Sequence, residues 1–249
     1  MIRINEEIIQ IKQPFQRHGW IMMQTWEHLL FLHWAVPPKV LRSLIPQELE
    51  IDTYQGMAWL GIIPFLMSGV RLRRLPMIPF TSTFPEINVR TYVKAKQKSG
   101  VYFLSLDASN PLITAIAKQW YRLPYFQASM RFAKQAHSIE FDSGRREKHS
   151  PPVQFSGTYE PVGNAFASDK ETIEHWLTER YTLFCQCDHS KRLYYADVYH
   201  EPWALQKAIV QLRENTMTKR LSIPLEPQPD LAFYARGVQS YVWPITRLY

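Results

Sequence analysis

Residues 84–128, FPEINVRTYVKAKQKSGVYFLSLDASNPLITAIAKQWYRLPYFQA, hold the strand pattern that decides the fold. Side chains alternate between the two faces of a β-strand, so residues 86–93 have one polar face and one largely apolar face. The polar face carries Glu86, Asn88, Arg90 and Tyr92. Residues 101–107 are apolar on both faces over their first half, which is typical of a strand buried on both sides. A partner strand shares that burial, so the polar face either meets water or lines a cavity. Buried charge is kept mostly where it is paired or functional.

The overall composition favours a folded, β-rich protein. The chain has 249 residues, of which 46% are hydrophobic and 14% are aromatic. A chain of this length and composition can bury a substantial core, and aromatic side chains pack well on pleated surfaces. We expect a single domain that spans residues 1–249.

No segment has the pattern of a membrane span or of a signal peptide. The longest apolar stretch, residues 57–70, is interrupted by glycine and proline and is shorter than the roughly 20 residues that a spanning helix needs. Residues 1–15 mix acids and bases with isoleucine and lack the continuous apolar core of a signal peptide. We therefore expect no membrane contact and a cytoplasmic location.

The net charge of +7 suggests an acidic partner, but its distribution argues against nucleic acid. The basic residues occur in small groups near probable turns, at 71–74, 94–98 and 145–148. No helix-turn-helix, RNA-binding sheet signature or zinc-finger spacing is present. The expected partner is a small molecule, anionic or aromatic, and the sequence leaves a homo-oligomer open.

Neither a metal nor a cofactor is expected. Cys185, Cys187 and His189 would share a strand face, but a closed zinc site needs four ligands and no usual spacing completes it. Paired strand cysteines are more often small packing residues. The chain contains no glycine-rich phosphate loop and no nucleophile elbow, and nine glycines make a dinucleotide site improbable.

Hydrophobic periodicity predicts many short strands and few helices. Strands are expected over residues 29–36, 48–54, 57–67, 86–93, 101–107, 126–134, 138–141, 153–159, 181–187, 192–200 and 231–242. Helices are expected over residues 39–45 and 112–120, after a capping box at 168–171, and from residue 201 through Leu205, Ala208, Ile209 and Leu212. This pattern indicates an α+β fold dominated by antiparallel strands, which could close into a barrel or cone.

A series of segments resembles one known family. In order they read FLHWAV, LRSLIPQELEIDTYQGMAWLGIIPF, FPEINVRTYV, GVYFLSLDA, LPYFQASM, RYTLF, HEPWAL and ARGVQSYVWPI, and they extend from about residue 15 to the C-terminus. They are similar to the YqjF-like family of uncharacterised proteins, which looks like a branch of the acetoacetate decarboxylase-like superfamily. The resemblance implies a mainly antiparallel, cone-shaped β-barrel with peripheral helices, and a central cavity lined by the Glu86 face.

The same resemblance implies that the decarboxylase chemistry is not intact. The decarboxylases attack a keto acid with a lysine activated by a neighbouring cation, in a Gly-Phe-Pro-Lys-Lys turn. The matching stretch here is residues 122–126, where Tyr125 and Phe126 stand at the two lysine positions, so no Schiff base can form there. Lys118 is the nearest lysine and is expected to be a solvated helix residue. Glu86, by contrast, matches the family's cavity carboxylate.

The candidate catalytic residues are Glu86, as a general acid or base, and Arg90, as a holder of a carboxylate or enolate. Candidate ligand-binding residues are Asn88, Tyr92, Arg122, Tyr125 and His33. Tyr125 could donate a hydrogen bond to an oxyanion, and Arg122 could share the role of Arg90. Structural interpretations are also open: Glu86 and Arg90 could neutralise other buried groups, and Tyr125 could be a core residue. His33 and His200 could equally be hydrogen-bonded structural residues.

Two functions therefore remain open. One is a small-molecule binding protein with an aromatic cavity and a few polar anchors. The other is a lyase-like or isomerase-like enzyme that acts on a keto or carboxylic acid by non-covalent acid–base chemistry. The missing lysine favours the binding protein.

Overall fold

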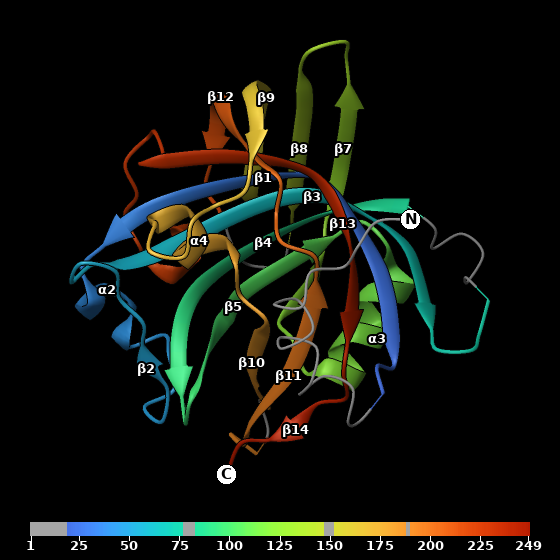
Figure 1. Ribbon diagram of the computed structural model, residues 1–249, viewed down its shortest axis with the longest axis vertical. Helices are drawn as coiled ribbons and strands as arrows, with labels where there is room; N and C mark the ends of the chain where they lie inside the picture. The colour runs from blue at the N-terminus through green and yellow to red at the C-terminus, as the bar shows by residue number, and fades with distance from the viewer. Residues whose placement is uncertain (1–18, 77–82, 147–151, 188–189) are drawn as a thin grey trace.

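The structure, a computed structural model, describes residues 19–76, 83–146, 152–187 and 190–249. One 14-stranded, mostly antiparallel sheet dominates it (Figure 1). The strands are β1 Met22–Val36, β2 Glu50–Ile51, β3 Ala58–Leu72, β4 Thr83–Ala95, β5 Lys98–Ala108, β6 Tyr125–Gln127, β7 Ser129–Lys134, β8 Ile139–Arg145, β9 Val153–Phe166, β10 Thr182–Gln186, β11 Leu193–His200, β12 Leu205–Asn215, β13 Leu231–Val242 and β14 Thr246–Arg247. The helices in the described ranges are α2 Pro38–Arg42, α3 Pro111–Tyr121, α4 Ile173–Thr178 and the 3-10 turn η1 Lys219–Leu221.

The strand pairing closes a ring. The order β11-β10-β5-β4-β3-β1-β13 returns to its start because Val198 and His200 of β11 pair with Val242 and Ser240 of β13. The strands of this ring are not evenly spaced about one axis. A mostly β fold with few helices is therefore confirmed, while the expected cone-shaped barrel and the single domain stay predictions.

Strands β4 and β5 form a hairpin within this ring, with β3 on one side of it and β10 on the other. Glu86 pairs with Ala108 of β5 on one side and with Phe65 of β3 on the other. Tyr92 belongs to one buried cluster and Val89 to a second, so both faces of β4 are covered. The polar face is therefore turned away from solvent, as a strand between two buried neighbours requires.

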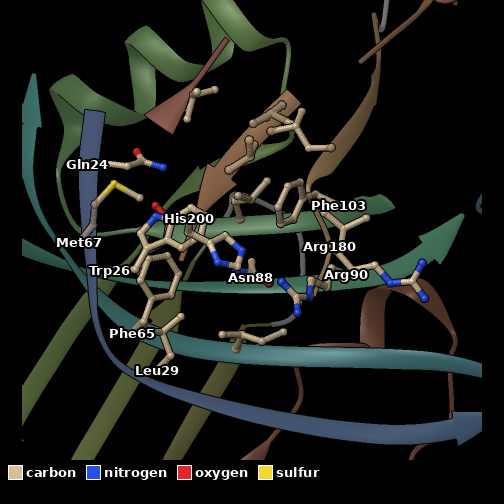
Figure 2. A pocket seen from close by; sticks show the side chains of 18 of the residues that line it. Gln24, Trp26, Leu29, Phe65, Met67, Asn88, Arg90, Phe103, Arg180 and His200 are labelled. Carbon is tan, nitrogen blue, oxygen red and sulfur yellow. The ribbon is translucent and has the colours of Figure 1, made fainter. Parts of the chain in front are cut away.

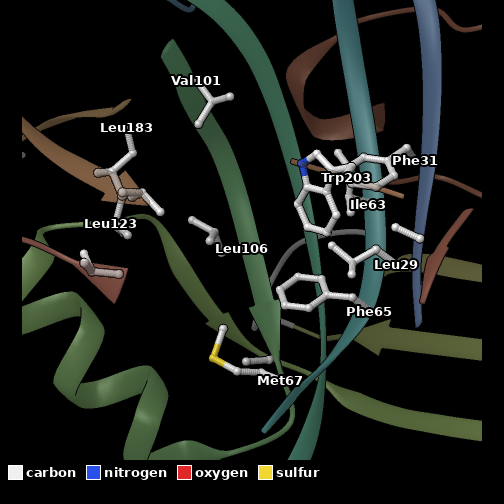
Figure 3. Packing of buried hydrophobic residues seen from close by; sticks show 14 of the residues in the cluster. Leu29, Phe31, Ile63, Phe65, Met67, Val101, Leu106, Leu123, Leu183 and Trp203 are labelled. Carbon is white, nitrogen blue, oxygen red and sulfur yellow. The ribbon is translucent and has the colours of Figure 1, made fainter. Parts of the chain in front are cut away.

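The first buried cluster packs against the inner side of the ring. Figure 3 shows its side chains converging from several strands and from the segments around α3 and β12. Its labelled members are Leu29, Phe31, Ile63, Phe65, Met67, Val101, Leu106, Leu123, Leu183 and Trp203.

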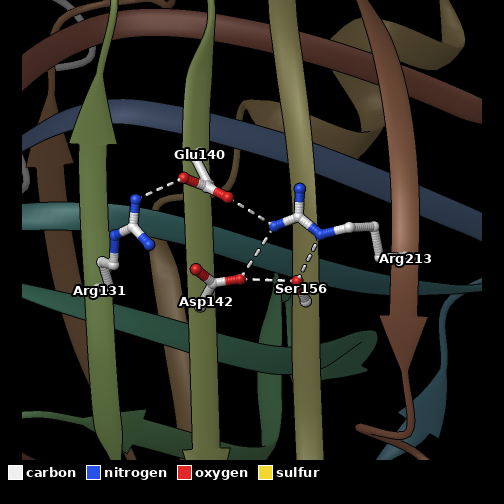
Figure 4. Close-up of polar contacts among 5 residues, drawn as sticks. All are labelled: Arg131, Glu140, Asp142, Ser156 and Arg213. Carbon is white, nitrogen blue, oxygen red and sulfur yellow. Dashed lines mark hydrogen bonds and ion pairs between the residues drawn. The ribbon is translucent and has the colours of Figure 1, made fainter.

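Beyond β13, strands β12, β9, β8 and β7 continue the sheet as an arm (Figure 1). One face of the arm carries a charged network in which Glu140 accepts from Arg131 at 2.8 Å and from Arg213 at 2.9 Å (Figure 4). Arg213 and Ser156 also contact Asp142. These side chains are half-exposed or exposed, so the network ties neighbouring strands without a large desolvation cost.

The helix predicted from residue 201 is wrong: this segment is strand β12. Its apolar residues fit helical spacing, but Ala208, Val210 and Leu212 also alternate with exposed Lys207, Gln211 and Arg213. Pairing with β9 runs along the whole of β12, and β13 pairs with its first three residues, Leu205 to Lys207. That long-range pairing overrides the local helical pattern.

Smaller boundaries also differ from prediction. The capping box at 168–171 does not cap α4, because the Thr172 hydroxyl accepts from the backbone N–H of His175 at 3.4 Å. Helix α2 ends at Arg42, whose guanidinium donates to three carbonyls of the following turn. The strand expected over 48–54 reduces to β2, which pairs with β4.

No helix within the described ranges is long and apolar enough to cross a membrane.

Candidate functional site

A cavity of about 170 Å³ lies inside the ring, against the polar face of β4. Its wall is mainly apolar and aromatic. The lining residues with functional groups are Gln24, Trp26, Arg71, Glu86, Asn88, Arg90, Tyr121, Tyr125, Thr178, Arg180, Thr182, His200 and Trp203. In Figure 2, Arg90 and Arg180 lie together on one side of the view, Gln24 and Met67 lie on the other, and Asn88 lies between.

Glu86 and Tyr125 form one polar pair in this wall. Arg122 has a φ of 54°, which ends α3, and Pro124 then leads into β6, where Tyr125 pairs with Leu106. The Tyr125 hydroxyl lies 3.1 Å from Glu86 Oε2, and only 2% of Glu86 is exposed. Burial raises the pKa of Glu86 to about 8; the bond from Tyr125 opposes this shift and the charge of Asp107 adds to it. Glu86 is therefore mostly a neutral carboxylic acid at pH 7.

Arg90 supplies positive charge to the wall. Its guanidinium lies 5.7 Å from the ring centroids of Phe31 and Tyr92 and donates to the Leu177 carbonyl at 3.4 Å. No carboxylate of the described residues forms an ion pair with it. Its Nε is buried without a hydrogen-bond partner among those residues. Arg90 is thus held by aromatic faces and one long hydrogen bond, with its charge uncompensated.

Arg180 lies beside it but is neutralised. Its Nη1 donates to buried Asp52 at 2.8 Å, and its Nε donates to the Trp176 carbonyl at 2.6 Å. The guanidinium also lies over the rings of Tyr92 and Trp176. Burial lowers the pKa of Arg180, and the charge of Asp52 opposes that shift. Arg180 therefore contributes shape and donors rather than an unpaired charge.

His200 ends β11 and also lines the cavity, near Trp26 and Asn88 in Figure 2. It is 2% exposed, and its ring lies 4.8 Å from Tyr181, 4.7 Å from Trp203 and 5.8 Å from Trp26, between centroids. Nδ1 lies 2.8 Å from the Glu201 carbonyl. Burial lowers the pKa of His200, so the imidazole is neutral at pH 7.

Several buried polar atoms of lining residues have no hydrogen-bond partner within the described part of the chain. They are Asn88 Oδ1, the Trp26 indole N–H, the Tyr121 hydroxyl, Arg90 Nε and Arg180 Nη2. Buried polar groups are nearly always satisfied in native proteins, so each such atom calls for an explanation. A bound polar molecule or ordered water in the cavity would supply it.

The structure brings together four of the seven predicted site residues: Glu86, Asn88, Arg90 and Tyr125 all line the cavity. The burial expected for the polar face is confirmed, since Glu86 is 2% and Asn88 6% exposed, with Arg90 partly buried. Their roles in binding or catalysis stay predictions.

The other three predicted residues do not line it. The Tyr92 hydroxyl bonds to His33 Nε2 at 2.7 Å, and both residues are fully buried behind Arg90 and Arg180. Arg122 is exposed and lies over the ring of Tyr194 at 4.8 Å. Tyr92 lies on the predicted face, but the rings and guanidinium groups packed over it separate it from the cavity.

Sequence reasoning missed Gln24, Trp26, Tyr121, Arg180 and Trp203, and it left His200 undecided. For His200 a signal exists, because alternation along residues 193–200 places Ala196, Val198 and His200 on one buried face. For Arg180, which lies between α4 and β10, the local sequence carries no signal of a place in the cavity wall. Its position depends on the long-range contact with Asp52.

The described lining residues include no lysine, so the described wall offers no amine for a Schiff base. The side chain of Lys118 lies outside the described residues. Cys185 and Cys187 are buried thiols, and burial raises the pKa of Cys185 to about 12, while His189 is outside the described ranges. In those ranges no three His, Cys, Asp or Glu side chains cluster as metal ligands would.

Comparison with known sequences assigns the family. The model of family DUF2071, described as "Uncharacterized conserved protein", matches residues 23–239. The chain belongs to this family. The "Uncharacterized protein YqjF" of Bacillus subtilis (strain 168) is 41% identical over 228 residues, which cover 92% of this chain and 93% of that protein. The resemblance inferred from the sequence segments is therefore confirmed.

Solved structures with the same fold include decarboxylase-like enzymes. An acetoacetate decarboxylase-like enzyme from Sphingomonas wittichii RW1 has a TM-score of 0.63 at 11% identity, with 92% of this chain and 94% of that chain covered. The enduracididine biosynthesis enzyme MppR, complexed with pyruvate, has the same TM-score and identity, with 94% and 92% covered. The acetoacetate decarboxylase of Legionella pneumophila has a TM-score of 0.61 at 10% identity, with 99% and 98% covered. At these identities the likeness shows the fold alone.

Proposed function

We propose that this chain is a small-molecule binding protein whose cavity holds a small organic carboxylate. The observation that carries the proposal is Arg90, a partly buried cation in the cavity wall with no carboxylate partner among the described residues. An uncompensated charge away from water is costly. A bound carboxylate would compensate it through charge-assisted, bidentate hydrogen bonds, which suit a guanidinium.

The remaining polar groups support an anionic ligand. With a pKa of about 8, Glu86 is mostly uncharged at pH 7 and does not repel an anion. The Tyr121 hydroxyl and the Trp26 indole N–H are donors without a partner in the described chain. Most of the remaining wall is apolar, including Phe65 and Phe103, which suits a ligand with one charged end and a small organic body.

Cavity size limits the ligand class. A volume of about 170 Å³ is close to the roughly 150 Å³ of an engineered apolar cavity that binds benzene. Nucleotides and long-chain lipids are too large for it. The structurally similar enzyme MppR is complexed with pyruvate, a small 2-oxo carboxylate, and this makes pyruvate a reasonable first probe.

The proposal includes reversible, non-covalent binding, since Tyr125 and Phe126 stand where the resemblance places the reactive lysines. It also includes closure of the strand ring into a cone-shaped barrel around the ligand, which the ring pairing and the decarboxylase-like neighbours support. A cytoplasmic location completes the proposal and rests on the sequence pattern alone.

The test compares carboxylates with their uncharged amides. Propionate, benzoate and pyruvate are titrated by calorimetry and by thermal shift against propionamide and benzamide. A ligand at one hundred times its dissociation constant should add about 2.7 kcal/mol to the free energy of unfolding.

Arg90→Gln should weaken carboxylate binding about 10- to 100-fold, as loss of a charge-assisted pair predicts. Arg131→Gln, in the exposed arm network, is the matched control and should bind as wild type. Equal binding of acids and amides, or full binding by Arg90→Gln, would overturn the proposal.

A further inference from the structure

The hydrogen bond at His200 Nδ1 determines which ring nitrogen can act as a base. A carbonyl oxygen only accepts hydrogen bonds, so the 2.8 Å contact with the Glu201 carbonyl requires a proton on Nδ1. Because burial keeps the ring neutral, Nε2 then carries the lone pair. No described residue forms a hydrogen bond with Nε2, and Nε2 is not among the fully buried polar atoms without a partner, so it is accessible from the cavity that His200 lines. The basic nitrogen is thus the one available to a ligand.

Glu86 lies in the same cavity with the complementary proton state. The walls that carry the two groups are linked by ring contacts: His200 packs on Trp26, and Trp26 lies 6.5 Å from Phe65, which pairs with Glu86 across β3 and β4. One group is a neutral acid and the other a neutral base. Acid–base catalysis usually relies on two titratable groups whose surroundings shift their pKa values apart, so that one group holds a proton and the other does not.

We propose that the cavity catalyses proton transfer next to the carbonyl of a small 2-oxo carboxylate, with His200 Nε2 as the base and Glu86 as the acid. This inference rests on the proposed function, because Arg90 must hold the carboxylate. It adds an activity and assigns the base to a residue from a different strand than Glu86.

The step balances without a cofactor. His200 Nε2 takes a proton from the carbon next to the carbonyl, and the electron pair of that C–H bond forms the enol double bond. The carbonyl oxygen accepts the proton of the Glu86 carboxyl group, which leaves an imidazolium and a carboxylate. Return of a proton to carbon from His200 and of the hydroxyl proton to Glu86 restores the 2-oxo acid. If the imidazolium exchanges its proton for one from the solvent between these steps, the carbon acquires a hydrogen from the solvent.

The charged and titratable groups around the pair set the pH range. Arg90 from β4 lowers the pKa of His200, whereas Glu179 and Glu201 oppose this, and the ring of Tyr181 packs against the imidazole. The Tyr125 hydroxyl donates to Glu86 and lowers its pKa, whereas the charge of Asp107, which pairs with Ile87 on the neighbouring strand, raises it. The active form needs neutral His200 and protonated Glu86. Its population rises with pH through the pKa of His200, below 6.5, and falls through a pKa of about 8.

The experiment measures exchange of the methyl protons of pyruvate and the C3 protons of 2-oxobutanoate with D₂O by proton NMR, above the buffer rate. Wild type should accelerate exchange with a bell-shaped pH profile. His200→Gln and Glu86→Gln should each slow it by about 100-fold or more, with binding of pyruvate changed less than about threefold. His175→Gln, on α4 outside the cavity wall, should exchange as wild type.

Each outcome decides the inference. If pyruvate binds but wild type shows no exchange above buffer, the inference is wrong and the proposed binding function stands. If propionate or benzoate binds while both 2-oxo acids neither bind nor exchange, the inference fails again and only carboxylate binding remains. If no carboxylate binds, both fail. Should His200→Gln not fold, the wild-type profile decides: exchange that keeps rising above pH 9 excludes Glu86 as the acid.

Discussion

The Tyr125 hydroxyl lies 3.1 Å from Oε2 and 3.3 Å from Oε1 of Glu86, deep in the cavity wall, at the position where the resemblance places a reactive lysine. A lysine there would favour the ionised carboxylate through its charge. A tyrosine only donates a hydrogen bond, which offsets part of the effect of burial, so the pKa of Glu86 remains raised to about 8. Tyr125 thus gives Glu86 a hydrogen-bond donor without a positive charge, and the carboxyl group stays mostly protonated at neutral pH.

Glu86→Gln should remove a large pH dependence of stability. The pKa of Glu86 rises on folding from 4.5 to about 8, so the folded state holds a proton that the unfolded state releases between these values. The contribution of Glu86 to the wild-type free energy of unfolding should therefore be fully present below about pH 4.5 and be lost as pH rises to about 8, by about 5 kcal/mol at most. Urea unfolding at pH 5, 7 and 9 should show a much flatter profile for Glu86→Gln. Glu140→Gln, at the surface, should keep the wild-type profile, and equal slopes in all three proteins would contradict the assignment.

Leu106→Phe should be tolerated where Leu60→Phe is not. Both leucines are buried, but Leu106 borders the cavity, so a larger ring can enter free space. Leu60 is fully buried in the second core cluster away from the cavity, where overpacking costs about 1–3 kcal/mol. Urea unfolding should show this difference, and Leu106→Phe should also weaken carboxylate binding. Equal losses of stability would mean that the cavity is closed to a larger side chain.

Gly100→Ala should be strongly destabilising and Gly144→Ala nearly neutral. A Cβ at Gly100 would lie 2.2 Å from the carbonyl oxygen of Thr182, at the β5–β10 junction of the ring, and a backbone atom cannot move aside cheaply. A Cβ at Gly144 would meet nothing within 4 Å. We expect a loss of about 3 kcal/mol or more at Gly100 and a change within about 1 kcal/mol at Gly144. Chemical denaturation of both variants checks the contrast, and a stable Gly100→Ala would argue against this strand junction.

Asp52→Asn should cost about 3–5 kcal/mol, because it removes the charge partner of buried Arg180 and of Lys94. The ion pairs of Glu140 are the surface comparison, since Arg131 and Arg213 are largely exposed. Glu140→Gln should change the free energy of unfolding by less than about 1 kcal/mol. Thermal and urea unfolding measure both variants. Similar small effects would mean that Asp52 does not hold Arg180 in place.

Period-two alternation was sufficient for the strand that carries the site. Glu86, Asn88 and Arg90 share a face whatever the strand pairs with, because consecutive side chains must point to opposite sides of a pleated backbone. The burial of the neighbouring strand β5 could be read from the apolar residues 101–107. The same reasoning failed for β12, since residues 205–212 satisfy helical and strand spacing at once. Only the ladders offered by β9 and β13 decided between them.

The sequence by itself thus determined the family, the mostly β fold, the polar face of β4 and the absence of lysine from residues 122–126, because each depends on local pattern or on residue identity. The tertiary structure alone decided which distant residues meet that face. His200 comes from β11, Trp26 from β1 and Arg180 from the segment after α4, and each is positioned by strand register or by an ion pair formed across the fold. Tyr92 and Arg122 were expected at the cavity but lie outside its wall for the same reason. The direction in which a side chain leaves its strand or turn depends on the local sequence, whereas the residues that pack over that side chain depend on the whole fold.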